Sequence, residues 1–278
     1  MNLFDRFQNR TLIQASLEMQ TALAVGSRLS LEPTGTDMPV LKDPNGLPLI
    51  PGSSLKGVVR FQAERILRAW NRPDLWACDP FGGPCVPETS RDGRNGKDKF
   101  WEEASKNDAV FAQKVFEASC TACRLFGSPW FAGRVAFKDA YLTNAEALPV
   151  ITQIRDGVGI DRDLGAARTG VKYDFETVVP GACFGLEILA ENLEDWEIGF
   201  LLTVLRLWEE GGIAIGGKTT RGPGWGRLKD LNIRQVTAAN LMDYLLNRQM
   251  AEVDADRFIQ AFRDWLKTKE AGHAQDAL

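Results

Sequence analysis

Histidine is almost absent from this sequence of 278 residues: the single one is His273, close to the C-terminus. Since histidine is the side chain most often used to transfer protons near neutral pH, histidine acid–base catalysis is largely excluded. Long hydrophobic runs are also missing, because no stretch reaches about eighteen apolar residues, and the opening MNLFDRFQNRTLI does not have the pattern of a signal peptide. We therefore expect a cytoplasmic protein without a membrane segment.

An excess of positive charge is lacking as well. Lys and Arg number 33 against 37 Asp and Glu, which gives a net charge of −4, whereas nucleic-acid-binding domains are usually basic. A local basic surface can override this overall balance, because charges are screened beyond about 10 Å in physiological salt. Hydrophobic residues at 44% and charged residues at 25% are typical of a soluble globular protein with one elaborated domain or two small ones.

Five cysteines are present, and in a cytosolic protein they are not expected to form disulfides. Cys120 and Cys123 form a C-x2-C pair, Cys78 and Cys85 form a looser pair in CDPFGGPC, and Cys183 is expected in the core of a strand. Two pairs in loop-like sequence can supply four thiolates for a tetrahedral structural Zn²⁺, although the 34 residues between them exceed the gap in compact zinc ribbons. The alternatives are buried thiols or a redox C-x2-C, but FAQKVFEAS before it has a helical pattern instead of a strand.

The hydrophobic pattern predicts an α+β fold. A strand or strand pair is expected in TLIQASLEMQTALAVG, followed by a helix in SSLKGVVRFQAERILRAW with Ser53 or Ser54 as its N-cap. After an insertion, RVAFKDAYL and ACFGLEILAE are expected strands, LEDWEIGFLLTVLRLWEE a second long helix and WGRLKDLNIRQV a last strand. Two helices are expected to close the chain. The expected elements therefore follow the order strand–helix–strand twice, which is the order of the ferredoxin-like split βαβ fold. The four-stranded sheet of this fold also occurs in RNA-recognition modules.

The stretch GGIAIGGKTTRGPGWGRL matches the pattern of a phosphate-binding loop of nucleotide hydrolases. Such a loop needs a strand before it and a helix that begins at Lys218-Thr219, so that helix amides face the phosphates. Here a helical pattern precedes it, and Gly-Pro-Gly at 222–224 interrupts a helix after it. Nucleotide hydrolysis is therefore the weaker hypothesis, and a glycine-rich loop that binds a polyanion is favoured. The residues it offers are Gly216, Gly217, Lys218, Thr219, Arg221 and Arg227.

A second segment, GTDMPVLKDPNGLPLIPGSSLKGVVR, is rich in proline and glycine, so a shaped loop is expected to lead into the first helix. Ser53, Ser54 and the first helix amides form a position that attracts phosphate, and Lys56 and Arg60 share one helix face. Taken alone, the segment fits a capped helix with two solvated cations at least as well. Asp43, in KDPNG, is expected to bond to its own turn.

Four segments in this order resemble the RAMP superfamily, the repeat-associated mysterious proteins of CRISPR systems. They are PVLKDPNGLPLIPGSSLKGVVR, CTACRLFGSPWFAGRVAFKDA, IDRDLGAARTG…YDFETVVPGACFGLEI and GGKTTRGPGWGRL. The resemblance is greatest to the backbone subunits of type III effector complexes and covers residues 12 to about 234. It implies a ferredoxin-like core whose copies stack along a CRISPR RNA with other subunits, while the RNA bases stay available for complementary target RNA.

The resemblance also assigns roles to residues. Phosphates of the guide RNA would lie on Ser53, Ser54, Lys56 and Arg60 and on the loop 216–227. A hairpin thumb at about 150–180, with Ile160, Asp161 and Arg162, would wedge into the guide–target duplex and flip a nucleotide; an ordinary exposed hairpin is the alternative. Zinc-binding cysteines occur in related proteins, which strengthens the prediction of a zinc site from Cys78, Cys85, Cys120 and Cys123.

The same resemblance makes Asp37 the candidate catalytic residue. In similar subunits an aspartate in this loop promotes cleavage of target RNA, by attack of a 2′-OH on the adjacent phosphate with Mg²⁺ or another divalent ion. RAMP nucleases that use a histidine match poorly, since His273 stands alone. The alternative is a structural RNA-binding scaffold without catalysis. We expect one RAMP domain over residues 1–234, with a cysteine-containing insertion at about 71–130, and a helical extension over 235–278.

Overall fold

The structure, a computed structural model, describes residues 4–26, 36–70, 72–91 and 93–276. Its largest sheet is antiparallel, with five strands in the order β3-β7-β1-β8-β9. The strands are β1 (Asn9–Met19), β3 (Val135–Phe137), β7 (Cys183–Glu191), β8 (Gly226–Thr237) and β9 (Ala251–Glu252). The fold is thus mixed α and β with antiparallel sheets, as the sequence predicts.

Two long helices connect strands of this sheet: α1 (Gly52–Trp70) lies in the chain between β1 and β3, and α5 (Asp195–Glu209) lies between β7 and β8. Side chains of β1 alternate between buried and half-exposed, as a strand with one face on the core requires. The buried Ile13 of β1 lies opposite Ile188 of β7 and Ile233 of β8. The register of the three central strands is therefore set by one continuous apolar row.

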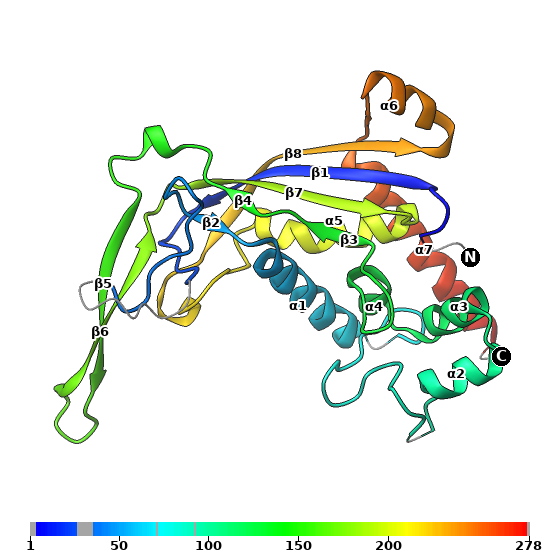
Figure 1. Cartoon of the computed structure of the whole chain (residues 1–278), viewed down its shortest axis with the longest axis horizontal. Coiled ribbons are helices and arrows are strands. Elements are labelled where there is room, and N and C mark those ends of the chain that lie inside the picture. The colour runs from blue at the N-terminus through cyan, green and yellow to red at the C-terminus, as the bar shows by residue number, and fades with distance from the viewer. Residues whose placement is uncertain (1–3, 27–35, 71, 92, 277–278) are drawn as a thin grey trace.

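The helices cover a single face of the sheet. Figure 1 shows α1, α5 and α7 (Ala255–Asp276) on the same side of it. Leu55 and Val59 of α1, Phe200 of α5 and Phe258 of α7 belong to one buried cluster with the strands. Gly199 permits the close packing of α5 on α7, since a Cβ at this position would lie 2.0 Å from the carbonyl oxygen of Phe258. The closing helix is therefore packed into the core.

The other face of the sheet carries paired charges. Among the described residues, three ion pairs lie there. The shortest N···O distance is 2.6 Å between Arg10 and Glu191 and 2.5 Å between Lys138 and Glu187, and the third pair joins Lys229 and Glu18. Strands β1 and β8 contain no aromatic residue, and Phe184, the one aromatic residue of β7, is fully buried. RNA-recognition modules stack bases on aromatic side chains of their sheet. These three strands offer no such stacking surface, so a nucleic-acid site has to be sought elsewhere on the molecule.

The segment RVAFKDAYL, expected as one strand, is divided into two. Strand β3 pairs with β7, whereas β4 (Ala140–Tyr141) pairs with β2 (Leu49–Ile50). Between them, Oδ1 of Asp139 accepts the amide of Gly52 at 2.7 Å. The expected N-cap at Ser53 or Ser54 is accordingly wrong: α1 begins at Gly52, and its first amide is satisfied from β3–β4 across 87 residues of sequence.

An insertion and a hairpin leave the core at different places. The insertion contains α2 (Lys97–Glu103), α3 (Asp108–Ala118) and α4 (Thr121–Phe126), with a small apolar cluster of Val86, Phe100 and Val115. The hairpin is a separate two-stranded sheet of β5 (Thr152–Ile160) and β6 (Ala167–Val178), which projects from the opposite end of the molecule (Figure 1). The expected hairpin at about 150–180 is thus present.

The C-terminal part contains α6 (Leu241–Asn247), β9 and α7, so the two expected closing helices are confirmed. Figure 1 places α6 beyond the edge of the sheet beside β8. Short 3-10 helices occur at Ala145–Ala147, Thr219–Arg221 and Ala238–Asn240. Within the described ranges, no helix has both the length and the apolar character needed to cross a bilayer.

Candidate metal centre and nucleic-acid interface

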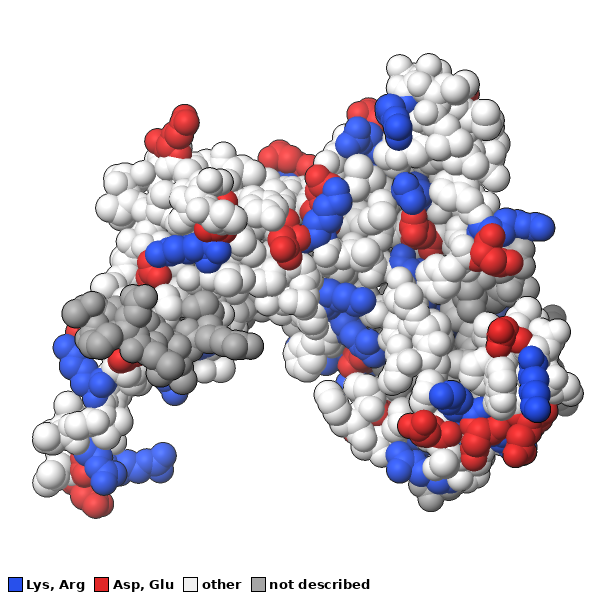
Figure 2. Space-filling model, in the orientation of Figure 1, with Lys and Arg blue, Asp and Glu red and all other residues white. Residues whose placement is uncertain are grey.

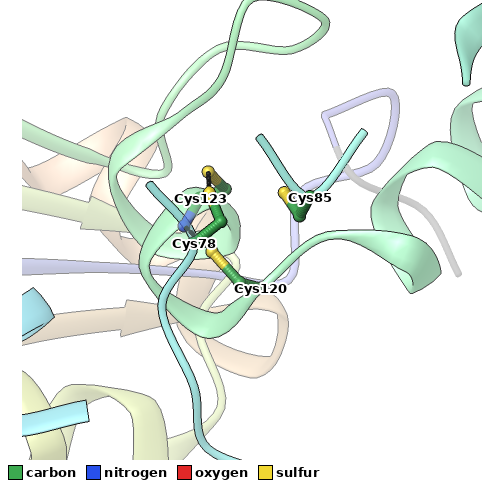
Figure 3. A group of neighbouring side chains, drawn as sticks. All are labelled: Cys78, Cys85, Cys120 and Cys123. Atoms are coloured by element: carbon green, nitrogen blue, oxygen red, sulfur yellow. Dashed lines mark hydrogen bonds between the residues drawn. The ribbon is translucent and has the colours of Figure 1, made fainter. Parts of the chain in front are cut away.

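Four cysteines from distant parts of the insertion converge (Figure 3). The sulfur atoms of Cys78, Cys85, Cys120 and Cys123 all lie within 4.8 Å of one another. Cys120 precedes α4 and Cys123 lies in its first turn, while Cys78 and Cys85 come from the loop after α1. The Sγ atoms of Cys78 and Cys123 are 3.7 Å apart. A tetrahedron with Zn–S bonds of about 2.3 Å has edges of about 3.8 Å, so the spacing fits a tetrahedral metal ion.

The close approach of the four thiols shifts their pKa values in opposite directions. Hydrogen bonds from Cys120 and Cys123 lower the pKa of Cys78 to about 7. Hydrogen bonds with Cys120, Cys78 and Cys85, together with burial, raise the pKa of Cys123. Neighbouring thiolates repel one another, so four of them at this spacing call for a cation between them.

Arg60 of α1 is turned toward this cluster. Its Nη2 lies 3.7 Å from Sγ of Cys123, its Nη1 donates to the carbonyl of Gly127 at 3.0 Å, and its Nε donates to Glu64 at 2.7 Å. Burial lowers the pKa of Arg60, but Glu64 and the charges of neighbouring cysteines raise it overall. The guanidinium predicted to contact RNA is therefore already occupied by protein groups, and its charge lies beside the sulfur atoms.

Lys56, one turn earlier on α1, has different surroundings. It lines a cavity of about 580 Å³ between α1, the cysteine loop and residues 127–133, together with Phe61, Phe81 and Trp130. Among the described residues, none forms an ion pair with Lys56. Its pKa is lowered, mainly because the amine is partly buried and in addition because the positive charge of Arg60 repels it. Phe81 is 95% exposed at this cavity. A cation without a partner beside aromatic rings suits a ligand with both phosphate and base.

Ser53 and Ser54 lie in the first turn of α1, on the surface side of the helix. The amides of Ser54 and Leu55 both donate to the carbonyl of Pro51, and that of Gly52 donates to Asp139. The helix amides expected to bind phosphate are thus largely satisfied within the protein. The side chain of Ser53 is exposed and that of Ser54 is partly exposed.

The glycine-rich loop does not have the architecture of a nucleotide-binding loop. Lys218 has a left-handed backbone with φ of 60°, and only a 3-10 helix at Thr219–Arg221 follows it. The expectation that no α-helix begins at Lys218-Thr219 is confirmed, so helix amides are not available there to face phosphates. Gly216, with φ of 90°, packs so closely that a Cβ would lie 2.6 Å from the carbonyl oxygen of Ala24. The amide of Gly217 donates to the same oxygen at 2.7 Å, which anchors the loop to the chain after β1.

Side chains of this loop lie against the base of the hairpin. Nζ of Lys218 is 4.9 Å from the ring centre of Tyr173 and 4.5 Å from that of Phe175 in β6. Arg221 donates to the hydroxyl of Tyr173 at 3.0 Å. A groove of about 550 Å³ lies between the loop and the hairpin. Arg227, by contrast, belongs to β8 and pairs in register with Glu18 on the outer face of the sheet, apart from the groove.

The hairpin tip exposes aliphatic side chains beside charges of both signs. Leu164 is 81% exposed and Ile160 is 58% exposed, and Arg162 is exposed between them. Oδ1 of Asp161 accepts the amides of Asp163 and Leu164, so this carboxylate shapes the turn. Figure 2 shows Lys and Arg side chains along the projecting hairpin, with acidic side chains near its end. A projecting strand pair with exposed aliphatic side chains has the form of a wedge.

Asp37 lies where the loop before α1 meets the hairpin. Its amide donates to Oδ1 of Asp174 at 2.7 Å, and its Oδ2 accepts the amide of Asp174 at 3.0 Å. Nζ of Lys218 is 3.4 Å from Sδ of the neighbouring Met38. The rival carboxylate of Asp43 instead accepts the amides of Asn45 and Leu47, which confirms its predicted role in a turn. Asp37 is therefore bonded to Asp174, which lies in β6 between Tyr173 and Phe175, two residues that line the groove.

Sequence reasoning missed four residues of β6 that surround these groups, namely Tyr173, Asp174, Phe175 and Glu176. The segment YDFE lies within the hairpin expected from the resemblance, but nothing local in the sequence connects it with Asp37 or Lys218. In the sequence, Asp37 precedes its partner Asp174 by 137 residues, and Arg221 follows its partner Tyr173 by 48 residues.

A sequence model of the RAMP superfamily matches residues 16–229. The chain belongs to the RAMP superfamily. Curated relatives are named CRISPR system Cms endoribonuclease Csm3. The protein of that name from Methanothermobacter thermautotrophicus is 27% identical over 83% of this chain and 88% of its own length. The protein of that name from Methanocaldococcus jannaschii is 26% identical over 81% of this chain and 81% of its own length. The one from Mycobacterium tuberculosis is 24% identical over 87% of this chain and 96% of its own length.

The RAMP superfamily match runs from within β1 to within β8. It includes Asp37, α1, the four cysteines, the hairpin and the glycine-rich loop. Helices α6 and α7 lie outside the matched residues, although α7 packs into the same core.

Proposed function

We propose that this chain is a CRISPR RNA-binding backbone subunit of a type III effector complex in antiviral defence, and that it cleaves target RNA paired with the guide. The proposal is supported by membership of the RAMP superfamily and by relatives, named as CRISPR endoribonucleases, that match more than four fifths of the chain. Its partners would be CRISPR RNA, complementary target RNA, further copies of the chain and other subunits. The core is assigned to the ferredoxin-like fold, on the strand order β3-β7-β1-β8 with α1 and α5 as crossovers.

The observation that carries the catalytic part is the position of Asp37 at the base of the hairpin, next to the groove lined by Lys218 and Arg221. Oδ2 of its carboxylate accepts a hydrogen bond from the amide of Asp174, and Oδ1 is the oxygen proposed to face RNA. In the proposed reaction the 2′-hydroxyl of a ribose gives its proton to water as its oxygen attacks the adjacent phosphorus, the bond from phosphorus to the 5′-oxygen breaks, and the 5′-oxygen takes a proton from water. The products are a 2′,3′-cyclic phosphate and a free 5′-hydroxyl.

Each group has a distinct part in this proposal. The carboxylate of Asp37 orients the attacking hydroxyl, or holds a water molecule of a divalent ion such as Mg²⁺, which would stabilise charge on the phosphate. Lys218 and Arg221 place cations beside the phosphate backbone. Ile160 and Leu164 at the hairpin tip wedge into the duplex, so that the phosphate at the flipped nucleotide is released from helical geometry.

The guide RNA is proposed to run over the surface of α1, past Ser53 and Ser54 in its first turn and Lys56, which lines the cavity. Gly216, Gly217 and Thr219 continue this surface on the glycine-rich loop. A hydrogen-bonded path joins the two regions: Gly217 bonds to Ala24, Leu41 bonds to Val25, and Leu49, just before α1, bonds to Leu41. This backbone connection between the glycine-rich loop and the start of α1 supports an RNA path over both.

We assign the cysteine cluster to a structural Zn²⁺ ion, because four sulfur ligands at tetrahedral spacing are the set that zinc prefers. Arg60 would act on this centre from outside, by offsetting the negative charge of four thiolates around one divalent ion.

The test is cleavage of guide-complementary RNA by the assembled complex with Asp37→Ala and with Asp37→Asn. Both substitutions remove the carboxylate charge, and we expect the cleavage rate to fall at least about 100-fold, the size of a lost charge-stabilising or proton-transferring group, while target binding is retained. Asp43→Asn, which keeps the turn's acceptor, is the matched control and should cleave at the normal rate.

Cleavage at the wild-type rate by Asp37→Ala would contradict the enzymatic proposal. The second candidate, a structural RNA-binding scaffold, would then hold. It is favoured by one observation, the reciprocal bond between Asp37 and Asp174, which gives this carboxylate a structural role of its own.

A further inference from the structure

Strand β6 of the hairpin holds the loop that carries Asp37. Asp37 and Asp174 are linked twice, since each carboxylate accepts the other residue's main-chain amide, at 2.7 and 3.0 Å. The two residues are 137 positions apart in sequence. A reciprocal pair of this kind fixes both the position of the loop and the rotation of the Asp37 side chain, because one of its oxygens must point at the strand.

A second link lies two residues further along β6. The amide of Glu176 donates to the carbonyl of Met38 at 3.0 Å, and its carboxylate accepts the amide of Val40 at 3.0 Å and Nζ of Lys42 at 2.7 Å. Burial alone would raise the pKa of Glu176, but the bonds from Lys42, Thr152 and Val40 lower it below its usual value. The carboxylate is therefore charged at neutral pH, and its bonds to the loop are charge-assisted.

Side chains between these two links complete the attachment. Met38 forms a parallel bridge with Phe175, and Lys218 contacts both the sulfur of Met38 and the ring of Phe175. Residues 37–42 are thus fastened to the hairpin along their length, and the glycine-rich loop is held against the same place.

We propose that Asp174 and Glu176 are positioning residues, which fix Asp37 to the base of the hairpin so that its carboxylate moves with the hairpin onto the RNA. This inference rests on the proposed function, since it takes Asp37 to act on target RNA. It also goes beyond it: the hairpin determines where the duplex opens, and the same strand determines where the carboxylate lies. Wedge and carboxylate would then keep a constant spacing along the RNA.

The experiment compares Asp174→Ala with Asp174→Asn in the assembled complex. Asp174→Ala removes the acceptor for the amide of Asp37, whereas the asparagine oxygen can still accept it. We expect Asp174→Ala to lower the single-turnover cleavage rate by about 10- to 100-fold, the loss that misplacement of a reacting group by about 1 Å can cause. Binding of guide and target should stay within about 2-fold, and Asp174→Asn should restore most of the rate.

Glu176→Ala loosens the other end of the attachment and should give a smaller loss of the same kind. Glu187→Ala is the matched control, because it also removes a carboxylate from a half-exposed ion pair but lies on the outer face of the sheet. This variant should cleave at the wild-type rate.

Hydrogen exchange on the isolated chain provides a readout that does not depend on assembly. The amides of Asp37 and Val40 should exchange slowly in the wild-type protein, and the amide of Asp37 should exchange faster in Asp174→Ala. Fast exchange of both amides in the wild-type chain would overturn the proposal.

The outcomes separate this inference from the proposed function. If Asp37→Ala leaves cleavage unchanged, the proposed function itself fails. If Asp37→Ala abolishes cleavage while Asp174→Ala cleaves at the normal rate, only the positioning inference fails. If Asp174→Ala lowers RNA binding in proportion to cleavage, Asp174 has a purely structural role, and the inference is again overturned.

Discussion

Lys56 and Arg60 illustrate how two similar residues on one helix face acquire different roles. Arg60 is held by Glu64, by the carbonyl of Gly127 and by the sulfur of Cys123, so its charge is compensated inside the protein. Lys56 forms no ion pair with a described residue and lies partly buried at a cavity. The charge available to a bound phosphate is therefore that of Lys56.

Lys56→Ala should weaken guide RNA binding by about 5- to 10-fold for all sequences alike, because a phosphate contact carries no sequence information. The slope of log K against log salt should become shallower by about 0.7, as expected for one phosphate contact to a single strand. Binding titrations at several salt concentrations measure both effects. Lys114→Ala, which removes an exposed lysine paired with Glu103, is the control and should change neither. A loss confined to particular sequences would rule out backbone contact.

Single residues were predictable where their partners are close in sequence. The turn at Asp43 and the pairing within each cysteine pair follow from spacing alone, and both are present. The bonds of Asp37 to Asp174 and of Gly52 to Asp139 join residues 137 and 87 positions apart. No local pattern encodes such contacts, because they arise only when distant segments meet on the folded sheet.

Among the elements, the hairpin stands apart, because β5 and β6 form a two-stranded sheet of their own that projects from the molecule (Figure 1). Most side chains of β6 near the tip are exposed, so the distal half of the hairpin contributes little to the core. Exposed aliphatic side chains at such a tip are costly to hydrate and gain from insertion between bases.

Leu164→Asp should therefore lower target cleavage by about 10-fold, since a charged side chain does not insert into a base stack, a loss of about 1.4 kcal/mol in transition-state stabilisation. The free energy of unfolding should change by less than about 0.5 kcal/mol, as for other surface substitutions. Cleavage assays and thermal unfolding measure these two quantities. Leu246→Asp on α6 replaces a similarly exposed leucine far from the hairpin and should cleave normally. Unimpaired cleavage by Leu164→Asp would exclude the wedge.

The long helices and strands were predictable because their apolar periodicity extends over two or more turns or repeats. RVAFKDAYL was predicted less well, because its nine residues serve two sheets and cap a helix in between. The start of α1 was misplaced for the same reason: a serine is the usual local cap, but a carboxylate from another element satisfies the first amide.

At the scale of the whole molecule, the cysteine cluster connects segments that the chain otherwise leaves apart. Cys78 and Cys85 follow α1, whereas Cys120 and Cys123 adjoin α4, and between them lie α2 and α3 with only a small apolar cluster of their own. A metal ion at the cluster would therefore contribute much of the stability of the insertion.

Metal analysis of the purified chain should find about one zinc ion per molecule. Chelation should lower the free energy of unfolding by at least about 2.7 kcal/mol relative to the chain at a free zinc concentration a hundred times its Kd. Thermal unfolding with and without chelator measures this difference. Cys120→Ser should remove the metal, whereas Cys183→Ser, at a cysteine outside the cluster, should retain it. A metal-free protein of unchanged stability would refute the site.

The carboxylate of Asp139 at the start of α1 has a consequence for how a polyanion approaches the molecule. Because this carboxylate already compensates the positive end of the helix dipole, a nucleic-acid strand arriving end-on would meet negative charge. The strand would instead have to cross the helix sideways, over the hydroxyls of Ser53 and Ser54 and the ammonium of Lys56. A crosswise path presents one sugar-phosphate edge to the protein and turns the opposite edge outward, toward a pairing strand.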